Sequence, residues 1–152
     1  GAHGRAATAS ATRSMWTKDE SEFHSKYYNF PAVRCFPKPA RKPHPPVLLG
    51  GSSKYVFKRI VEWGDGWLPT GLSVEAIQSG CATMRELAEK SGRDPKSLDV
   101  IVFGAPGKFR TKDEVATLKK AGFTHATIWL NRTAKSDVIA ELEELARTVL
   151  PA

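Results

Sequence analysis

The hydrophobic pattern of residues 47–152 alternates between two kinds of segment. Four short apolar runs are each followed by a longer segment in which apolar residues recur every three or four positions. Short continuous apolar runs are typical of buried strands, and the longer period is typical of amphipathic helices. The predicted strands cover residues 47–49, 67–68, 100–103 and 126–130.

The predicted helices have recognisable end signals. Ser73 precedes one helical pattern, and Thr111 with Glu114 has the spacing of a capping box before another. Ser136 is the predicted N-cap of the last helix, and Gly64 is predicted to follow the end of the first. The helices are therefore predicted near residues 53–63, 73–91, 111–121 and 136–150.

This alternation of strands and helices predicts an α/β fold with a parallel sheet and right-handed crossovers. Four strand–helix units are long enough to form a small open sheet. They are equally compatible with half of an eight-unit barrel, because the period of the hydrophobic pattern is the same in both architectures.

Residues 1–46 have a different character. Residues 1–15 are predicted to comprise a tag remnant, Gly1 to His3, and a short helix with a thin apolar face. Residues 16–46 form an irregular aromatic and proline-rich segment, in which an irregular hairpin or an aromatic-anchored loop leads into an extended connection from Pro31 to Pro46. A platform for stacking nucleic-acid bases is the alternative interpretation of these aromatic residues. The predicted division of the chain is thus 1–15, 16–46 and 47–152.

The charge and the composition narrow the classes of partner. A net charge of +7 favours anionic partners such as phosphate-bearing coenzymes. The basic residues form no long block, which disfavours nucleic acid. Cys35 and Cys81 lack metal-site spacing, and no apolar stretch reaches membrane-spanning length. These observations predict a cytoplasmic protein with no metal and no membrane partner.

The candidate chemistry lies in Gly50, Gly51, Ser52 and Ser53, between the first predicted strand and its helix. Two glycines permit a sharp turn, and a serine caps the helix whose N–H groups and positive dipole end attract anions. The turn is therefore a candidate phosphate site. A strand-to-helix connection without a ligand remains an equal alternative, because the tetrapeptide alone is a weak signal.

An ordered set of phrases resembles the C-terminal half of the luciferase-like monooxygenase family, particularly the branch that uses the deazaflavin coenzyme F-420. The phrases include Met15-Trp16-Thr17, Tyr27-Tyr28, Pro43-His44-Pro45-Pro46 leading into Gly50-Gly51-Ser52, Gly64-Asp65-Gly66-Trp67 and Gly92-Arg93-Asp94-Pro95. The resemblance runs from Trp16 onward and implies half of a (β/α)8 barrel of the TIM type.

The resemblance also implies a function and a set of site residues. The family contains flavin- or deazaflavin-dependent oxidoreductases, so FMN or the F-420-type coenzyme is expected, with its phosphate at Gly50, Gly51, Ser52 and Ser53. Trp67 is a candidate to line the ligand cavity, and packing is its alternative role. Catalytic residues stay unassigned, because the family's first four units are absent from this sequence. The three internal histidines, His24, His44 and His125, are interpreted as structural or solvated.

A four-stranded half-barrel would leave two open edges, which favours self-association. Two copies related by a two-fold axis would close an eight-stranded barrel as a homodimer. A non-catalytic half-barrel that binds a phosphate-bearing ligand, or acts as a self-associating scaffold, is the alternative function. The residues expected to fill such a barrel are Val47, Leu49, Val100, Val102, Ile128 and Leu130, although the sequence leaves open which alternate set points inward.

Overall fold

The computed structural model of the chain describes residues 2–150. It divides into two compact units, Gly1–Val47 and Leu48–Ala152. Gly1 of the predicted tag remnant lies outside the described residues. The predicted α/β fold with a parallel sheet is confirmed, and the parallel sheet lies in the second unit.

The first unit contains a helix and an antiparallel hairpin. Helix α1 (Ala2–Thr17) is followed by β1 (Ser21–His24) and β2 (Asn29–Val33). Phe23 and Phe30 are paired across the hairpin, and their ring centroids are 6.0 Å apart. The ammonium group of Lys38 donates to the carbonyl oxygens of Met15 and Lys18 at the C-terminal end of α1, at 2.8 and 2.5 Å. A cation at this end of a helix satisfies carbonyls that lack intrahelical partners.

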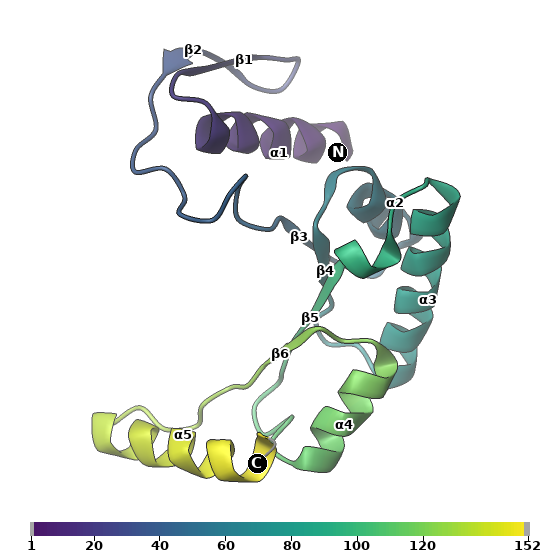
Figure 1. Cartoon of the computed structure of the whole chain (residues 1–152), viewed down its shortest axis with the longest axis vertical. Coiled ribbons are helices and arrows are strands. Elements are labelled where there is room, and N and C mark those ends of the chain that lie inside the picture. Colours follow the sequence, from purple (N-terminus) through teal and green to yellow (C-terminus); the bar gives the residue numbers. More distant parts are fainter. Residues whose placement is uncertain (1, 151–152) are drawn as a thin grey trace. The chain divides into compact units, whose positions relative to one another are not determined.

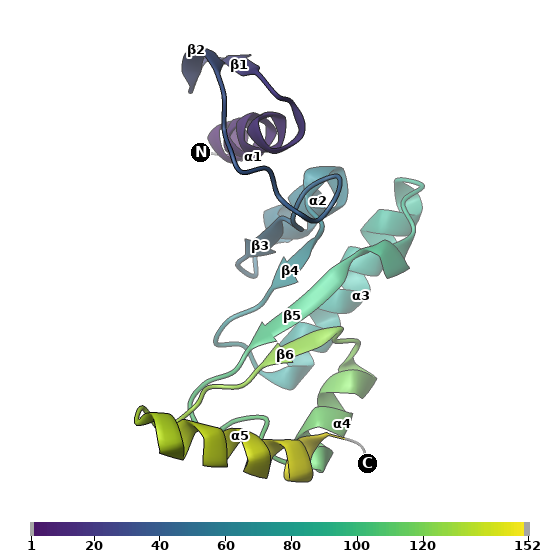
Figure 2. The ribbon, with the colours of Figure 1, turned by 60° about the vertical axis from the view of Figure 1, so that its left-hand side comes forward.

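The second unit is a parallel sheet with strand order β3-β4-β5-β6 (Figures 1 and 2). The strands are β3 (Leu48–Gly50), β4 (Gly66–Leu68), β5 (Asp99–Phe103) and β6 (His125–Thr127). The intervening helices are α2 (Lys54–Trp63), α3 (Val74–Lys90) and α4 (Lys112–Ala121), with a short 3-10 helix, η1 (Pro95–Ser97), before β5. Helix α5 (Lys135–Val149) ends the described chain and lies next to α4.

The helix-facing side of the sheet carries the core. Leu49, Trp67 and Val100 are neighbours across three adjacent strands. All three are buried, and Trp67 packs against the ring of Phe57 in α2. Val102, two residues after Val100, is buried on the same side because side chains alternate along a strand. Burial of these apolar side chains is what holds the helices to the sheet.

The predicted inward-facing set therefore needs correction. Leu49, Val100 and Val102 face the helices, whereas alternation places Ile101 and Phe103 of β5 on the opposite face of the sheet. Ile128 to Leu130 lie beyond β6, which ends at Thr127. An unbroken apolar run does not reveal which of its alternate residues face the helices.

The helix ends largely follow the predicted signals. The Ser73 hydroxyl accepts a hydrogen bond from the Ala76 N–H, and Thr111 and Glu114 form the predicted capping box. Ser136 is not the N-cap of α5, which begins at Lys135 with Ala134 in the capping position. The Ser136 hydroxyl instead bonds the carboxylate of the adjacent Asp137, at 3.2 Å.

Candidate functional site

The Gly50–Ser53 turn lies at the carboxyl end of β3 and leads directly into α2. Gly51 has a φ of 106°, a conformation that side chains with a Cβ rarely adopt. A Cβ built on Gly51 would have no atom within 4 Å, so the turn faces open space. Backbone conformation, rather than crowding by the protein, is therefore what requires glycine here.

The N-terminus of α2 keeps hydrogen-bonding capacity for a ligand. Ser53 occupies the N-cap position, but its side chain makes no capping hydrogen bond to the helix. Ser52, Ser53 and Lys54 are exposed, and the first turn of α2 contains no acidic residue. An anion that approached this turn would meet backbone N–H groups, serine hydroxyls and the positive end of the helix dipole.

Trp67 supports this turn from within the core. Its side chain is fully buried, and its ring meets the edge of Phe57 at a centroid distance of 4.9 Å and an angle of 77°. The indole N–H donates to the carbonyl oxygen of Gly51 at 2.7 Å. Trp67 thus has the packing role, and through one hydrogen bond it also fixes the backbone of the turn. The sequence did not predict this contact, because the two residues are 16 positions apart.

A cavity of about 730 Å³ opens at the carboxyl ends of β4 and β5. Its floor includes Ile77 of α3, Val102 of β5 and Leu118 of α4, and its rim includes Phe103 and Trp129. The rings of Phe103 and Trp129 meet edge to face, with centroids 5.9 Å apart. None of the four residues of the Gly50–Ser53 turn lines this cavity. Sequence reasoning missed the cavity, whose walls come from loops far apart in the chain.

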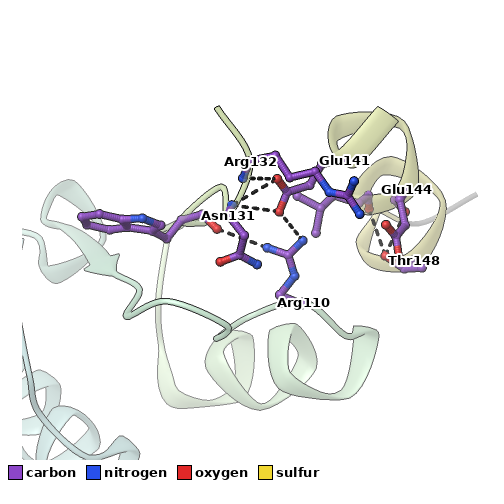
Figure 3. Close-up of polar contacts among 8 residues, drawn as sticks. Arg110, Asn131, Arg132, Glu141, Glu144 and Thr148 are labelled. Carbon is purple, nitrogen blue, oxygen red and sulfur yellow. Dashed lines mark hydrogen bonds and ion pairs between the residues drawn. The ribbon is translucent and has the colours of Figure 1, made fainter. Parts of the chain in front are cut away.

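A buried ion pair joins the loops that follow β5 and β6 (Figure 3). The Arg110 guanidinium donates to the Glu141 carboxylate at 2.6 Å, and to the carbonyl oxygen of Trp129 at 3.1 Å. Glu141 is only 3% exposed, and it also accepts hydrogen bonds from the backbone N–H groups of Asn131 and Arg132, each at 3.1 Å. The network fixes both loops to α5.

The same contacts explain the acidity of Glu141. Hydrogen bonding from the Asn131 N–H, together with bonds from Arg110 and Arg132, holds the pKa of the Glu141 carboxyl below its ordinary value despite burial. Glu141 is therefore a charged structural group at neutral pH. All of these hydrogen bonds come from groups within the protein, and they are sufficient to explain why the carboxylate is buried.

The remaining titratable candidates do not assemble into a site. Cys35 and Cys81 are both free thiols, the first exposed and the second buried. Across residues 2–150, no three side chains of the His, Cys, Asp and Glu types come together as a metal site would require. Within that same range, no helix has the length and apolar character needed to cross a membrane.

Comparison with known proteins places the chain in one family. A family model described as luciferase-like monooxygenase matches residues 8–148. An FMNH(2)-dependent dimethylsulfone monooxygenase of Pseudomonas putida is 33% identical over 86 residues, which cover 57% of this chain and 24% of that protein. An uncharacterised protein of Mycobacterium tuberculosis is 28% identical over 139 residues, which cover 90% of this chain and 46% of that protein. The chain spans less than half the length of these curated relatives.

Two solved structures share the fold. The coenzyme F-420-dependent tetrahydromethanopterin reductase of Methanopyrus kandleri superposes with a TM-score of 0.70 at 12% identity, covering 95% of this chain and 61% of the other. An F-420-dependent secondary alcohol dehydrogenase, in complex with an F-420–acetone adduct, superposes with a TM-score of 0.68 at 12% identity, covering 94% and 60%.

Proposed function

Because this chain belongs to the luciferase-like monooxygenase family, we propose that it forms half of a barrel that binds a flavin or deazaflavin coenzyme for oxidoreductase chemistry. The observation that carries the proposal is the Gly50–Ser53 turn. It combines a left-handed glycine, a helix N-terminus and an N-cap hydroxyl without a capping bond, at the carboxyl end of a parallel strand. Ligands of barrel enzymes bind at that end of the strands.

In the proposed complex, the coenzyme phosphate accepts hydrogen bonds from the backbone and hydroxyl groups of Gly51, Ser52 and Ser53. Gly50 ends the strand so that the turn can begin, and Trp67 holds the turn through its bond to the Gly51 carbonyl. The coenzyme supplies the redox chemistry when bound. The residues of this chain bind and orient it.

The identity of the coenzyme is proposed from the relatives. Two neighbours of known structure are F-420-dependent, and a curated relative is FMNH(2)-dependent. All of these coenzymes are flavin-type molecules that carry a phosphate, which suits the net charge of +7. We therefore propose FMN or the F-420-type deazaflavin. The free thiols of Cys35 and Cys81 suit a reducing, cytoplasmic setting.

A homodimer would complete the barrel. Among residues 2–150, β3 and β6 each pair with only one strand of the parallel sheet, which leaves one edge of each open. Open edges favour pairing with another chain. In the proposed dimer, β3 of each copy pairs with β6 of its partner around a two-fold axis. The face of the sheet that carries Ile101 and Phe103 would then line the interior.

A non-catalytic module is the second candidate. The chain covers 24% to 46% of the length of the curated relatives named above, so it lacks counterparts of many of their residues. A half-barrel of this kind could keep the phosphate turn as a ligand-binding module, or act as a self-associating scaffold. Coenzyme binding without turnover would favour the binding module, and neither binding nor turnover would favour the scaffold.

The test compares two glycine variants in a fluorescence anisotropy titration with FMN and with coenzyme F-420. Gly51→Ala introduces a Cβ and backbone strain at the turn. Gly92→Ala is the matched control, because Gly92 also has a positive φ, of 74°, and open space around it, but follows α3. We expect micromolar binding by the wild type, about −8 kcal/mol, at least tenfold weaker binding by Gly51→Ala, and no change in Gly92→Ala. Equal affinities in folded variants would exclude the proposed site.

A further inference from the structure

The cavity at the ends of β4 and β5 has the size and the lining of a small-molecule site. Its volume, about 730 Å³, falls within the range of about 300–1,000 Å³ that is typical of ligand pockets. Ile77, Val102 and Leu118 on its floor are each about 3% exposed in relative terms. The floor therefore consists of the helix-facing side of the sheet and the inner faces of α3 and α4.

The loop that closes one side of the cavity is conformationally strained. Phe109 has a φ of 63°, which is unusual for a residue with a bulky side chain. Gly104 makes room for it, since a Cβ there would lie 2.9 Å from the Phe109 ring. Strain of this kind persists only where the surrounding structure enforces it, and it gathers at ligand sites.

The rim presents aromatic surface to solvent. In a single copy of the chain, Phe103 and Trp129 are 44% and 48% exposed, although they lie beside an apolar cavity. Large aromatic side chains that stay half-exposed around a concave apolar surface mark binding sites more often than isolated surface residues do. A ligand seated in the cavity would cover the inner faces of these two rings.

Three of the polar side chains around the cavity are already used within the protein. The Ser73 hydroxyl accepts from the Ala76 N–H, and the Thr117 hydroxyl donates to the Asp113 carbonyl oxygen at 2.8 Å. The Glu114 carboxylate accepts from the N–H of Arg110 at 2.9 Å, as well as from Thr111. The exposed side chains of Thr70, Lys108 and Asp113 also line the cavity, but Ile77, Val102 and Leu118 on the floor present only apolar surface. An apolar ligand seated on this floor would lose no hydrogen bond on leaving water.

We propose that this cavity between α3 and α4 is a second ligand site, separate from the Gly50–Ser53 turn, and that it takes an uncharged organic molecule rich in hydrocarbon or aromatic surface. The apolar floor and the aromatic rim recognise the molecule by shape and burial. The site goes beyond the proposed coenzyme turn, with which it shares no lining residue.

A titration with the neutral fluorophore N-phenyl-1-naphthylamine tests this site. Thr117→Phe would fill the cavity, and Thr148→Phe is its control, because Thr148 makes the same hydrogen bond to the carbonyl four residues earlier, on α5. Trp129→Ala would remove part of the rim, and Tyr55→Ala is its control, as another exposed aromatic residue away from the cavity. Circular dichroism checks that each variant folds.

We expect saturable binding of one probe per chain by the wild type and by both controls, and at least tenfold weaker binding by Thr117→Phe and Trp129→Ala. Unchanged affinity in either cavity variant would overturn the proposal, and so would equal loss in the controls. Displacement of the probe by FMN would also overturn it, because the cavity would then belong to the coenzyme. Unchanged FMN affinity in Thr117→Phe would support two separate sites, and the Gly51→Ala result tests the coenzyme turn independently.

Discussion

At the scale of single residues, the contact between Trp67 and Gly80 shows how a small side chain permits the core to form. A Cβ on Gly80 in α3 would overlap the Trp67 ring and would lie 2.9 Å from the Phe57 ring. The glycine therefore allows α3 to approach the sheet closely enough to bury Trp67 completely. Because Trp67 also bonds Gly51, this packing contact is connected to the candidate phosphate turn.

Gly80→Ala is expected to destabilise the protein even though alanine is the better helix former. The gain in helix propensity, about 1 kcal/mol, is smaller than the cost of the overlap with the Trp67 ring. We expect a net loss of about 2 kcal/mol in the free energy of unfolding, measured by urea denaturation. Ser79→Ala, at the adjacent exposed position of α3, is the control and should be neutral or slightly stabilising. If Gly80→Ala were as stable as this control, the space between Gly80 and the Trp67 ring would be large enough for a methyl group, which would contradict the close contact.

Sequence reasoning at this scale found the residues of the turn but not their support. The Gly-Gly-Ser-Ser phrase is a local signal, because glycine conformation and N-cap preference depend on a few adjacent residues. The bond from Trp67 to Gly51 and the cavity around Trp129 depend on tertiary packing between distant segments. The sequence could not decide which face Val100 and Val102 occupy, since an unbroken apolar run has the same pattern in either orientation.

At the scale of elements, α5 is held by polar contacts as much as by apolar ones. Its buried positions are Glu141, Leu145 and Val149, spaced by four residues. The sequence pattern predicted an apolar helix face and did not anticipate a carboxylate within it. Glu141 stands there because Arg110 and two backbone N–H groups satisfy it.

Glu141→Gln is expected to lower the free energy of unfolding at pH 7, because the substitution leaves the Arg110 guanidinium without its charged acceptor. Urea denaturation measures this change. Glu143→Gln, at an exposed position of the same helix, is the control and should change stability by less than about 0.5 kcal/mol. Equal effects of the two substitutions would contradict a stabilising role for the buried pair.

The same pair predicts a dependence on pH. The folded protein holds the pKa of Glu141 below its ordinary value of 4.5. The unfolded chain therefore binds a proton first as the pH falls, so the stabilisation is complete above pH 4.5 and is lost as the pH falls through the lower, folded-state value. Wild-type stability should drop more steeply than that of Glu141→Gln below pH 4.5. Parallel pH profiles of the wild type and Glu141→Gln would contradict the assignment of this pH dependence to Glu141.

At the scale of the whole molecule, the parallel sheet of residues 48–150 has helices packed against one face, and within that range its outer strands β3 and β6 each pair with a single strand. The parallel direction of the strands could be predicted, because strands joined by helical crossovers run the same way. Their order, β3-β4-β5-β6, could not be predicted, since a doubly wound sheet has the same alternation of strands and helices along the chain. The closure of a barrel could not be predicted, since the hydrophobic period is the same in a half-barrel, an open sheet and a full barrel. Family resemblance supplied that expectation, and the oligomeric state remains a proposal to be measured.

Sedimentation velocity tests the proposed homodimer. At tens of micromolar we expect the wild type to sediment as a dimer. Ile101→Glu places a charge on the open face of β5 and should shift the protein to monomer, while Ile139→Glu, at an exposed position on α5, should leave the dimer intact. A wild-type protein that is monomeric throughout this range would exclude closure by two copies.

The central claim is that the Gly50–Ser53 turn recognises a phosphate, and comparing FMN with riboflavin on the wild-type protein tests it most directly. The two ligands share the ring system and differ by the phosphate alone. Charge-assisted hydrogen bonds from the turn should contribute about 1.5–3 kcal/mol, so FMN should bind at least tenfold more tightly than riboflavin. In Gly51→Ala, the affinity for FMN should fall to that for riboflavin. Equal binding of FMN and riboflavin by the wild type would contradict the account.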